Sequence, residues 1–108
     1  MQVSRRLRLN LLYDFYGELL TGRQRQFFEM HFQEDLSLGE IAANLGISRQ
    51  AVHDLLGRTA RQLEYYEERL ELAGRHGQRL GWLAQLEEVL AAGDLAGARD
   101  LLERLKNG

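Results

Sequence analysis

The sequence predicts an all-α protein, and three observations lead to that fold class. Apolar residues recur at spacings of three and four, the helical period, and runs that alternate at a spacing of two are almost absent. Two capping boxes mark helix starts, and glycines follow several apolar runs. With 108 residues, 44% hydrophobic and 28% charged, the chain fits one soluble domain with an appendage, and this composition excludes disordered and low-complexity classes.

Two helices are expected at the start of the chain. The first carries an apolar stripe spaced by four residues, with further apolar residues beside it: Leu7, Leu11, Phe15 and Leu19, then Leu12, Tyr16 and Leu20. The second begins at Thr21, which has the capping-box spacing to Gln24, and it carries Phe27, Phe28 and Phe32. Six of the nine aromatic residues lie between positions 13 and 32, so these helices should form the main core.

The middle of the chain has the pattern of a helix-turn-helix. A second capping box, Ser37 to Glu40, opens a short helix that Gly46 stops, because glycine enters the left-handed conformation without a Cβ penalty. Ile47 is the expected buried turn residue, and Ser48 caps a long helix that is predicted to run to Gly74. That helix has an a/d seam typical of bundles: Val52, Leu56, Thr59, Leu63, Tyr66 and Leu70.

The remainder of the chain predicts a helical hairpin after a break at residues 74–77. Its two apolar stripes are Trp82, Leu86, Val89 and Leu90, and then Leu95, Ala98, Leu102 and Leu105. We therefore expect a helix-turn-helix domain over residues 1–74 and a C-terminal hairpin over residues 75–108. A lone hairpin cannot bury both stripes, which predicts a homodimer or a partner that covers them.

Several motifs also carry a family resemblance. Part of the chain resembles region 4 of bacterial sigma factors. The residues that carry this resemblance are Leu20-Thr21, Gln24-Arg25, residues 35–42, residues 47–52, Arg58 and Leu63. Residues 11–16 and Tyr66-Glu67 extend this to a resemblance to the YlxM family of bacterial helix-turn-helix proteins. The resemblance spans residues 9 to about 72, and this sequence has His53 where the family usually has an aromatic residue. It implies a regulatory or accessory factor of the signal recognition particle pathway, whose partners would be DNA, the particle's RNA or its GTPase.

The long helix supplies a candidate reading face for nucleic acid. With Val52 pointing inward, Gln50, Asp54, Gly57 and Arg61 point outward, and His53 and Arg58 lie on the shoulders. Glutamine can read adenine, arginine can read guanine or hold a phosphate, and a helix start can meet a phosphate. The Asp54 carboxylate repels phosphate. It could accept from a cytosine amino group, but it is expected to pair with Arg58. The candidate nucleic-acid-binding residues are Arg25, Ser48, Arg49, Gln50, His53, Arg58 and Arg61.

The charge balance limits how this face can bind. The 14 Lys and Arg against 16 Asp and Glu exclude binding by bulk electrostatics, so contact with nucleic acid must be local. Glu64, Glu67, Glu68 and Glu71 form an acidic ridge that is expected to be solvated. Because carboxylates repel phosphate, the surface in contact with nucleic acid should end one or two turns past Arg61. The run of Arg5, Arg6 and Arg8 could anchor anionic RNA or lipid, but it is interpreted as a frayed, solvated terminus. The alternatives to nucleic-acid binding are a protein-interaction adaptor and a dimeric transcription regulator.

Catalysis has no support in the sequence. The three histidines lie more than twenty residues apart, and the chain has no cysteine, no phosphate-cradling glycine loop and no nucleophile elbow. We therefore predict a protein that is not an enzyme, with no cofactor and no metal. No uncharged stretch is long enough to span a membrane, and no secretory signal is expected, so the predicted location is the cytoplasm.

Overall fold

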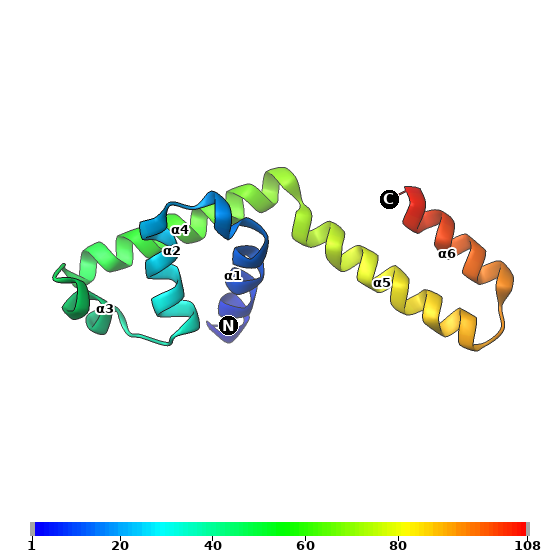
Figure 1. The fold of residues 1–108 in the computed structure, drawn as a ribbon, viewed down its shortest axis with the longest axis horizontal. Coiled ribbons are helices and arrows are strands. Elements are labelled where there is room, and N and C mark those ends of the chain that lie inside the picture. Colours follow the sequence, from blue (N-terminus) through cyan, green and yellow to red (C-terminus); the bar gives the residue numbers. More distant parts are fainter. Residues whose placement is uncertain (1, 108) are drawn as a thin grey trace. The chain divides into compact units, whose positions relative to one another are not determined.

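A computed structural model describes residues 2–107, and side chains from residue 5 to residue 107. Every secondary-structure element of this part of the chain is helical, which confirms the all-α fold class. The chain divides into two compact units between Glu71 and Leu72. The first contains helices α1 (Gln2–Tyr16), α2 (Gly22–Phe28), α3 (Leu38–Leu45) and α4 (Arg49–Leu70), with a 3₁₀ turn, η1 (Gly17–Leu19), and a π turn, η2 (Glu29–Gln33). The second contains α5 (Leu72–Ala91) and α6 (Leu95–Asn107) (Figure 1).

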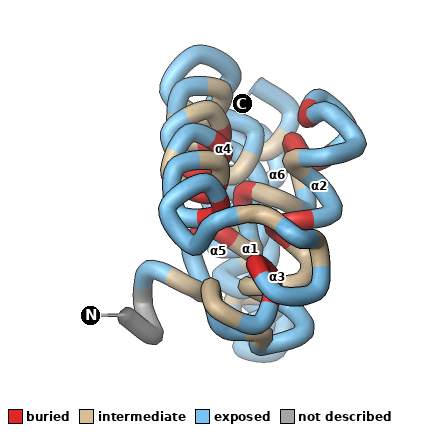
Figure 2. Tube along the Cα trace, turned by 90° about the vertical axis from the view of Figure 1, so that its left-hand side faces the viewer, coloured by how far each residue is buried: buried red, intermediate tan, exposed pale blue. Residues whose placement is uncertain are grey.

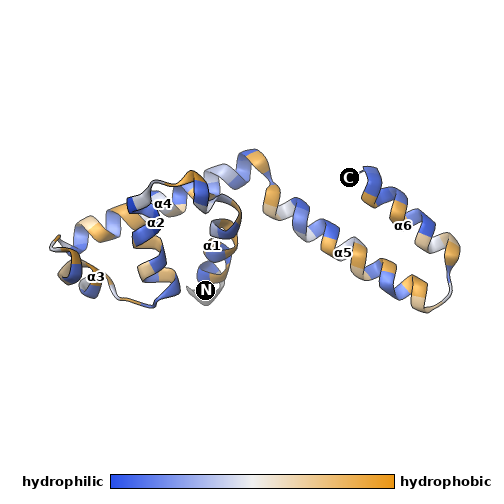
Figure 3. Cartoon of the chain, in the orientation of Figure 1, coloured by the Kyte–Doolittle hydropathy of each residue, from blue (hydrophilic) through white to orange (hydrophobic). Residues whose placement is uncertain are grey.

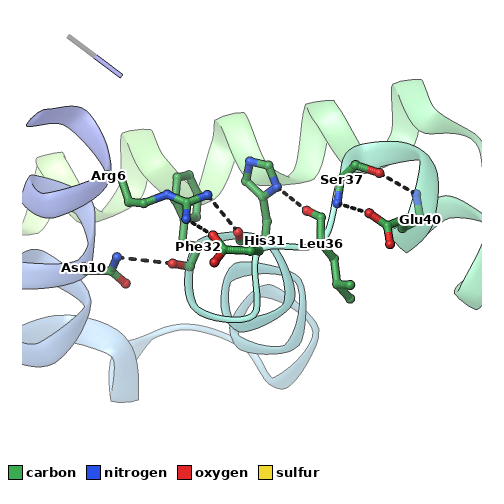
Figure 4. Close-up of polar contacts among 8 residues, drawn as sticks. Arg6, Asn10, His31, Phe32, Leu36, Ser37 and Glu40 are labelled. Carbon is green, nitrogen blue, oxygen red and sulfur yellow. Dashed lines mark hydrogen bonds and ion pairs between the residues drawn. The ribbon is translucent and has the colours of Figure 1, made fainter. Parts of the chain in front are cut away.

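Both predicted capping boxes are present at the starts of α2 and α3. The Thr21 hydroxyl accepts the Gln24 N–H at 3.1 Å, and the Gln24 side chain accepts the Thr21 N–H at 3.0 Å. Ser37 and Glu40 make the same two bonds, each at 3.0 Å (Figure 4). The bond from the Ser37 backbone lowers the pKa of the Glu40 carboxyl. This cap therefore contributes fully at neutral pH and is lost as the pH falls through that lowered pKa.

Helix α4 is the scaffold of the first unit, because α1, α2 and α3 all pack against it. Its inward face follows the predicted seam as far as Leu63, since Val52, Leu56, Thr59 and Leu63 are buried. Beyond that point the seam is not buried: Tyr66 is half-buried, and Leu70, at the end of the helix, is exposed. The buried Thr59 hydroxyl donates a hydrogen bond to the Leu55 carbonyl at 2.8 Å. Figure 2 shows the buried positions of the unit in red. One cluster joins α2, α3 and α4 and consists of Phe27, Ile41, Ala42, Val52 and Leu56.

The predicted apolar stripe of α1 is only partly correct: the residues expected beside it, Leu12, Tyr16 and Leu20, are buried, whereas most of the stripe itself is exposed. Leu9, Leu12 and Tyr16 are buried, whereas Leu7 and Leu11 are 67% and 45% exposed. Leu19, in η1, is also exposed. The buried face of α1 packs on α4, and on the same side the Arg8 guanidinium donates two bonds of 2.7 Å to the Glu64 carboxylate of α4.

The interpretation of the first arginines as a frayed terminus is also corrected. Arg6 forms an ion pair with Asp35 and donates to the His31 carbonyl at 3.3 Å. The bond to Glu64 raises the pKa of Arg8, so the charged form of its guanidinium is favoured. Both side chains belong to the folded unit, and Arg5 precedes them on the same helix, α1.

The long helix ends earlier than predicted. It stops at Leu70, and Glu71 adopts a left-handed conformation with φ 54° while its N–H donates to the Glu67 carbonyl at 2.9 Å. The expected break at residues 74–77 is wrong, because Gly74 and Gly77 lie within α5. Non-glycine residues seldom adopt this conformation, which is why the sequence pattern indicated the nearest glycine as the helix end.

The second unit is the predicted hairpin, with α5 packed on α6. Gly93 makes the turn with φ 76°, and the Asp94 carboxylate accepts the Gly97 N–H at 2.9 Å, which caps α6. The inner residues of α6 are Ala98 and Leu101, in place of the expected Leu102, which is 47% exposed. Leu95 of the same predicted stripe is exposed as well. Apolar positions recur along both helices in Figure 3.

None of the helices within residues 2–107 combines the length and the apolar character that a membrane crossing requires.

Candidate nucleic-acid interface

The helix-turn-helix is built by α3, a tight turn and the first half of α4. Gly46 takes the left-handed conformation with φ 67°, and the Ile47 N–H donates to the Ala42 carbonyl at 3.1 Å. Ile47 is half-buried against the core cluster. Ser48 then caps α4, since its hydroxyl accepts the Ala51 N–H at 3.0 Å. Because the core cluster holds α3 and α4 together, the opposite face of α4 is presented to solvent.

Three of the predicted residues lie together on that exposed face. His53, Arg58 and Arg61 line a hollow of about 430 Å³ with Asp54 and Gly57, which we call the outer hollow. Arg49 and Gln50 are exposed on the turn of α4 that precedes it. Arg49, Arg58 and Arg61 have no ion pair with any residue the structure describes, so their charges remain available to a ligand.

The expected pair between Asp54 and Arg58 does not form. The Asp54 carboxylate accepts from the Gln50 side-chain amide at 2.8 Å and lies 3.5 Å from the His53 ring nitrogen Nδ1. Asp54 is therefore engaged by its own neighbours, and Arg58 is left unpaired among the described residues. This bond uses one of the two N–H groups of the Gln50 amide, which leaves the second N–H and the carbonyl oxygen for a base edge.

Two predicted residues have other surroundings. The Ser48 hydroxyl is used by the helix cap described above. Arg25, on α2, is exposed and does not line the outer hollow. Its contact with the Tyr13 phenol raises the pKa of Arg25, and the carboxylates of Glu29 and Glu18 act in the same direction. The charge of Arg25 is therefore partly offset by its neighbours.

The structure also adds residues that the sequence analysis did not select. Arg5, His31 and Phe32 line a smaller hollow of about 130 Å³, which we call the inner hollow. It shares His53 and Gly57 with the outer hollow and is completed by Leu38 and Leu56. The π turn brings its backbone toward α1, where Arg6 donates to the His31 carbonyl and Asn10 to the Phe32 carbonyl (Figure 4). These contacts span more than twenty residues of sequence, so no local pattern could have revealed them.

Two residues of the acidic ridge, Glu64 and Glu67, form hydrogen bonds to side chains of α1. Glu64 receives both bonds from Arg8, and Glu67 accepts the Tyr16 hydroxyl at 2.5 Å. The expectation of a simply solvated ridge is therefore wrong for these two residues. Glu68 is exposed, and it follows Arg61 by about two turns. Among residues 5–107 there is also no group of three potential metal ligands.

Comparison with known proteins identifies the family. A family model described as "Putative helix-turn-helix protein, YlxM / p13 like" (UPF0122) matches residues 3–96. The chain belongs to this family. A UPF0122 protein of Symbiobacterium thermophilum is 46% identical, with 92% of each chain covered. A relative from Listeria monocytogenes is 43% identical over 93% of each chain. One from Caldanaerobacter subterraneus is 48% identical over 76% of this chain and 70% of its own.

These matches confirm the resemblance drawn from the sequence and extend it. The motifs used above end near residue 72, whereas the family model continues to residue 96 and thus includes all of α5. The family model therefore covers most of the second unit, from residue 72 to residue 96. The description of the family is that of a "putative helix-turn-helix protein", which agrees with the motif formed by α3 and α4.

Proposed function

We propose that this protein is a non-catalytic nucleic-acid-binding protein that uses the outward face of α4. The observation that carries the proposal is the outer hollow, where Arg58 and Arg61 have no carboxylate partner among the described residues. Exposed, unpaired guanidinium groups on a helix-turn-helix are suited to phosphate oxygens and to the guanine edge. Gln50 and Arg49, one turn earlier, would supply contacts to bases and to a phosphate near the helix start.

The resemblance to the YlxM family supports a role in the signal recognition particle pathway. We propose a regulatory or accessory factor whose ligand is DNA or the particle's RNA, since both present phosphodiester groups to α4. The protein-interaction adaptor, with the particle's GTPase as partner, is the second candidate. It is favoured by the exposed Leu7 and Leu11 on α1, which form an apolar edge outside the core.

Salt dependence tests the proposal. Arg25, Arg49, Arg58 and Arg61 offer about four phosphate contacts, which give a log–log slope of affinity against salt near −3.6, or steeper, for duplex DNA. The measurement is fluorescence anisotropy of labelled duplex DNA and labelled duplex RNA, titrated with the full-length protein from about 50 to 200 mM salt. Binding that is undetectable even at the lowest salt, or that does not change with salt, would contradict the proposal.

We also propose that the second unit mediates a homodimer. Leu83, Leu90 and Leu102 remain 44%, 53% and 47% exposed on the hairpin, and two-fold dimers are the commonest way to cover such surfaces. Leu83→Glu with Leu90→Glu is expected to convert the dimer to a monomer in light scattering. Leu7→Glu, on α1, is the matched control and should leave the mass unchanged. A wild-type protein that is monomeric at high micromolar concentration would overturn this proposal.

A further inference from the structure

Gly57 occupies a position that the fold does not explain. It lies in the interior of α4, where glycine disfavours the helix relative to alanine. A Cβ atom built there would meet a single neighbour within 4 Å, the Arg61 Nη1 atom at 3.3 Å, which is the mobile end of a long side chain. No part of the core therefore requires the absence of a side chain. Glycine is also used where a ligand must approach the backbone closely, and Gly57 faces the solvent side of the helix.

Three hollows that share lining residues adjoin one another around Gly57, and together we call them the depression. Gly57 and His53 line both the outer and the inner hollow, so the two meet at this glycine. Beyond the inner hollow, a further hollow of about 320 Å³ is lined by Arg5, Arg6, His31 and Phe32. The depression therefore extends from Arg58 and Arg61 to the beginning of α1.

The charges along this depression are predominantly positive. Arg5, Arg58 and Arg61 have no ion pair among the residues described, whereas Arg6 and Arg8 are neutralised by Asp35 and Glu64. The one carboxylate that lines these three hollows is Asp54, which Gln50 already engages. Arg5 and Arg61 also line a common hollow of about 400 Å³ beside Ala60, so their side chains border the same surface. The carboxylates of Glu64 and Glu68 line this fourth hollow as well, and Glu64 is paired with Arg8.

We propose that a phosphodiester strand of the bound nucleic acid crosses α4 over Gly57, with its phosphates held by Arg58, Arg61 and Arg5, whose side chains border the hollows around this glycine. This inference rests on the proposed function and adds to it a strand path and a phosphate contact from α1. The missing side chain of Gly57 lets the sugar-phosphate backbone approach the helix. Arg61 covers the hollow in the free protein and moves onto a phosphate when the strand enters.

Gly57→Ala in the full-length protein gives a test in which stability and binding change in opposite directions. The substitution should raise the melting temperature by about 4–8 °C, because alanine favours the helix. It should also lower the affinity for the labelled duplex by about tenfold, because the methyl group occupies the path of the strand. Gly81→Ala is the matched control, since it lies in α5 with no atom within 4 Å of its added Cβ. It should raise stability similarly and leave binding unchanged.

Arg5→Ala tests the contact from α1 independently. Arg5 adds a fifth phosphate contact, so the wild-type salt slope should be near −4.5 for duplex DNA and should fall to about −3.6 in the variant. Arg79→Ala, an exposed arginine of α5, is the control for loss of one charge. Running duplex DNA and duplex RNA in parallel identifies which nucleic acid supplies the phosphodiester, as the probe that the wild-type protein binds more tightly.

The outcomes separate this inference from the proposed function. If Gly57→Ala and Arg5→Ala both bind like the wild-type protein while Arg49→Ala with Gln50→Ala does not bind, the strand path is overturned and the proposed function stands. If the wild-type protein binds neither probe at low salt, the proposed function itself fails. Weakened binding by both variants, with unchanged controls, supports the path over Gly57.

Discussion

Replacement of Phe27 by alanine is expected to destabilise the first unit by about 3–5 kcal/mol, because the change leaves a cavity in the cluster that joins α2, α3 and α4. Phe27 is fully buried in the same cluster as Ile41, Ala42 and Val52. Its removal therefore weakens the packing of α2 against the helix-turn-helix formed by α3 and α4. A domain stabilised by about 5–15 kcal/mol would lose a large share of its stability. Urea unfolding followed by circular dichroism measures the effect.

The control for this experiment is Leu7→Ala. Leu7 is apolar as well, but it is 67% exposed, so its replacement should change the free energy of unfolding by less than about 0.5 kcal/mol. A Phe27 variant as stable as the Leu7 variant would show that the cluster does not hold the helices together.

The second large effect is expected on binding. Arg49→Ala with Gln50→Ala should abolish nucleic-acid binding and lower the melting temperature by no more than a few degrees, because both side chains face solvent on the first turn of α4. The bond from Gln50 to Asp54 is exposed and contributes little to stability. Anisotropy and thermal unfolding of the same samples separate the two quantities.

A matched variant checks that the loss is local. Gln78→Ala with Arg79→Ala removes the same two residue types from adjacent, exposed positions of α5 and should bind normally. If the Arg49 and Gln50 variant unfolds, these residues are structural and the assigned face of α4 is wrong. If it binds normally, the contact lies elsewhere on the molecule.

The parts of the fold that the sequence predicts are those set by local chemistry. Capping boxes at Thr21 and Ser37 act within four residues, and the left-handed conformation of Gly46 depends on its missing Cβ, so each can be read from a short segment. The seam of α4 is also local, because a 22-residue helix repeats its inward face several times. These features together suffice to predict the helix-turn-helix.

The sequence-based predictions are wrong where contacts between distant segments determine the structure. In α1 the spacing of apolar residues is compatible with two faces, and the bonds of Arg8 to Glu64 on α4 accompany the burial of the Leu12 face. The end of α4 at Glu71 depends on a conformation that few sequences indicate. At the candidate site, Arg5 and His31 come beside His53 only because α1 and the π turn pack near α4. Such juxtapositions cannot be read from spacing along one helix.

Nuclear magnetic resonance of the full-length, isotope-labelled protein tests the central claim most directly, because a chain of 12.5 kDa gives resolved amide signals. On addition of the duplex that binds more tightly, we predict shifts concentrated at Arg49, His53, Gly57, Arg58 and Arg61, with α5 and α6 unaffected near their exposed leucines. Shifts confined to the second unit, or to Leu7 and Leu11 of α1, would contradict nucleic-acid binding by the outward face of α4.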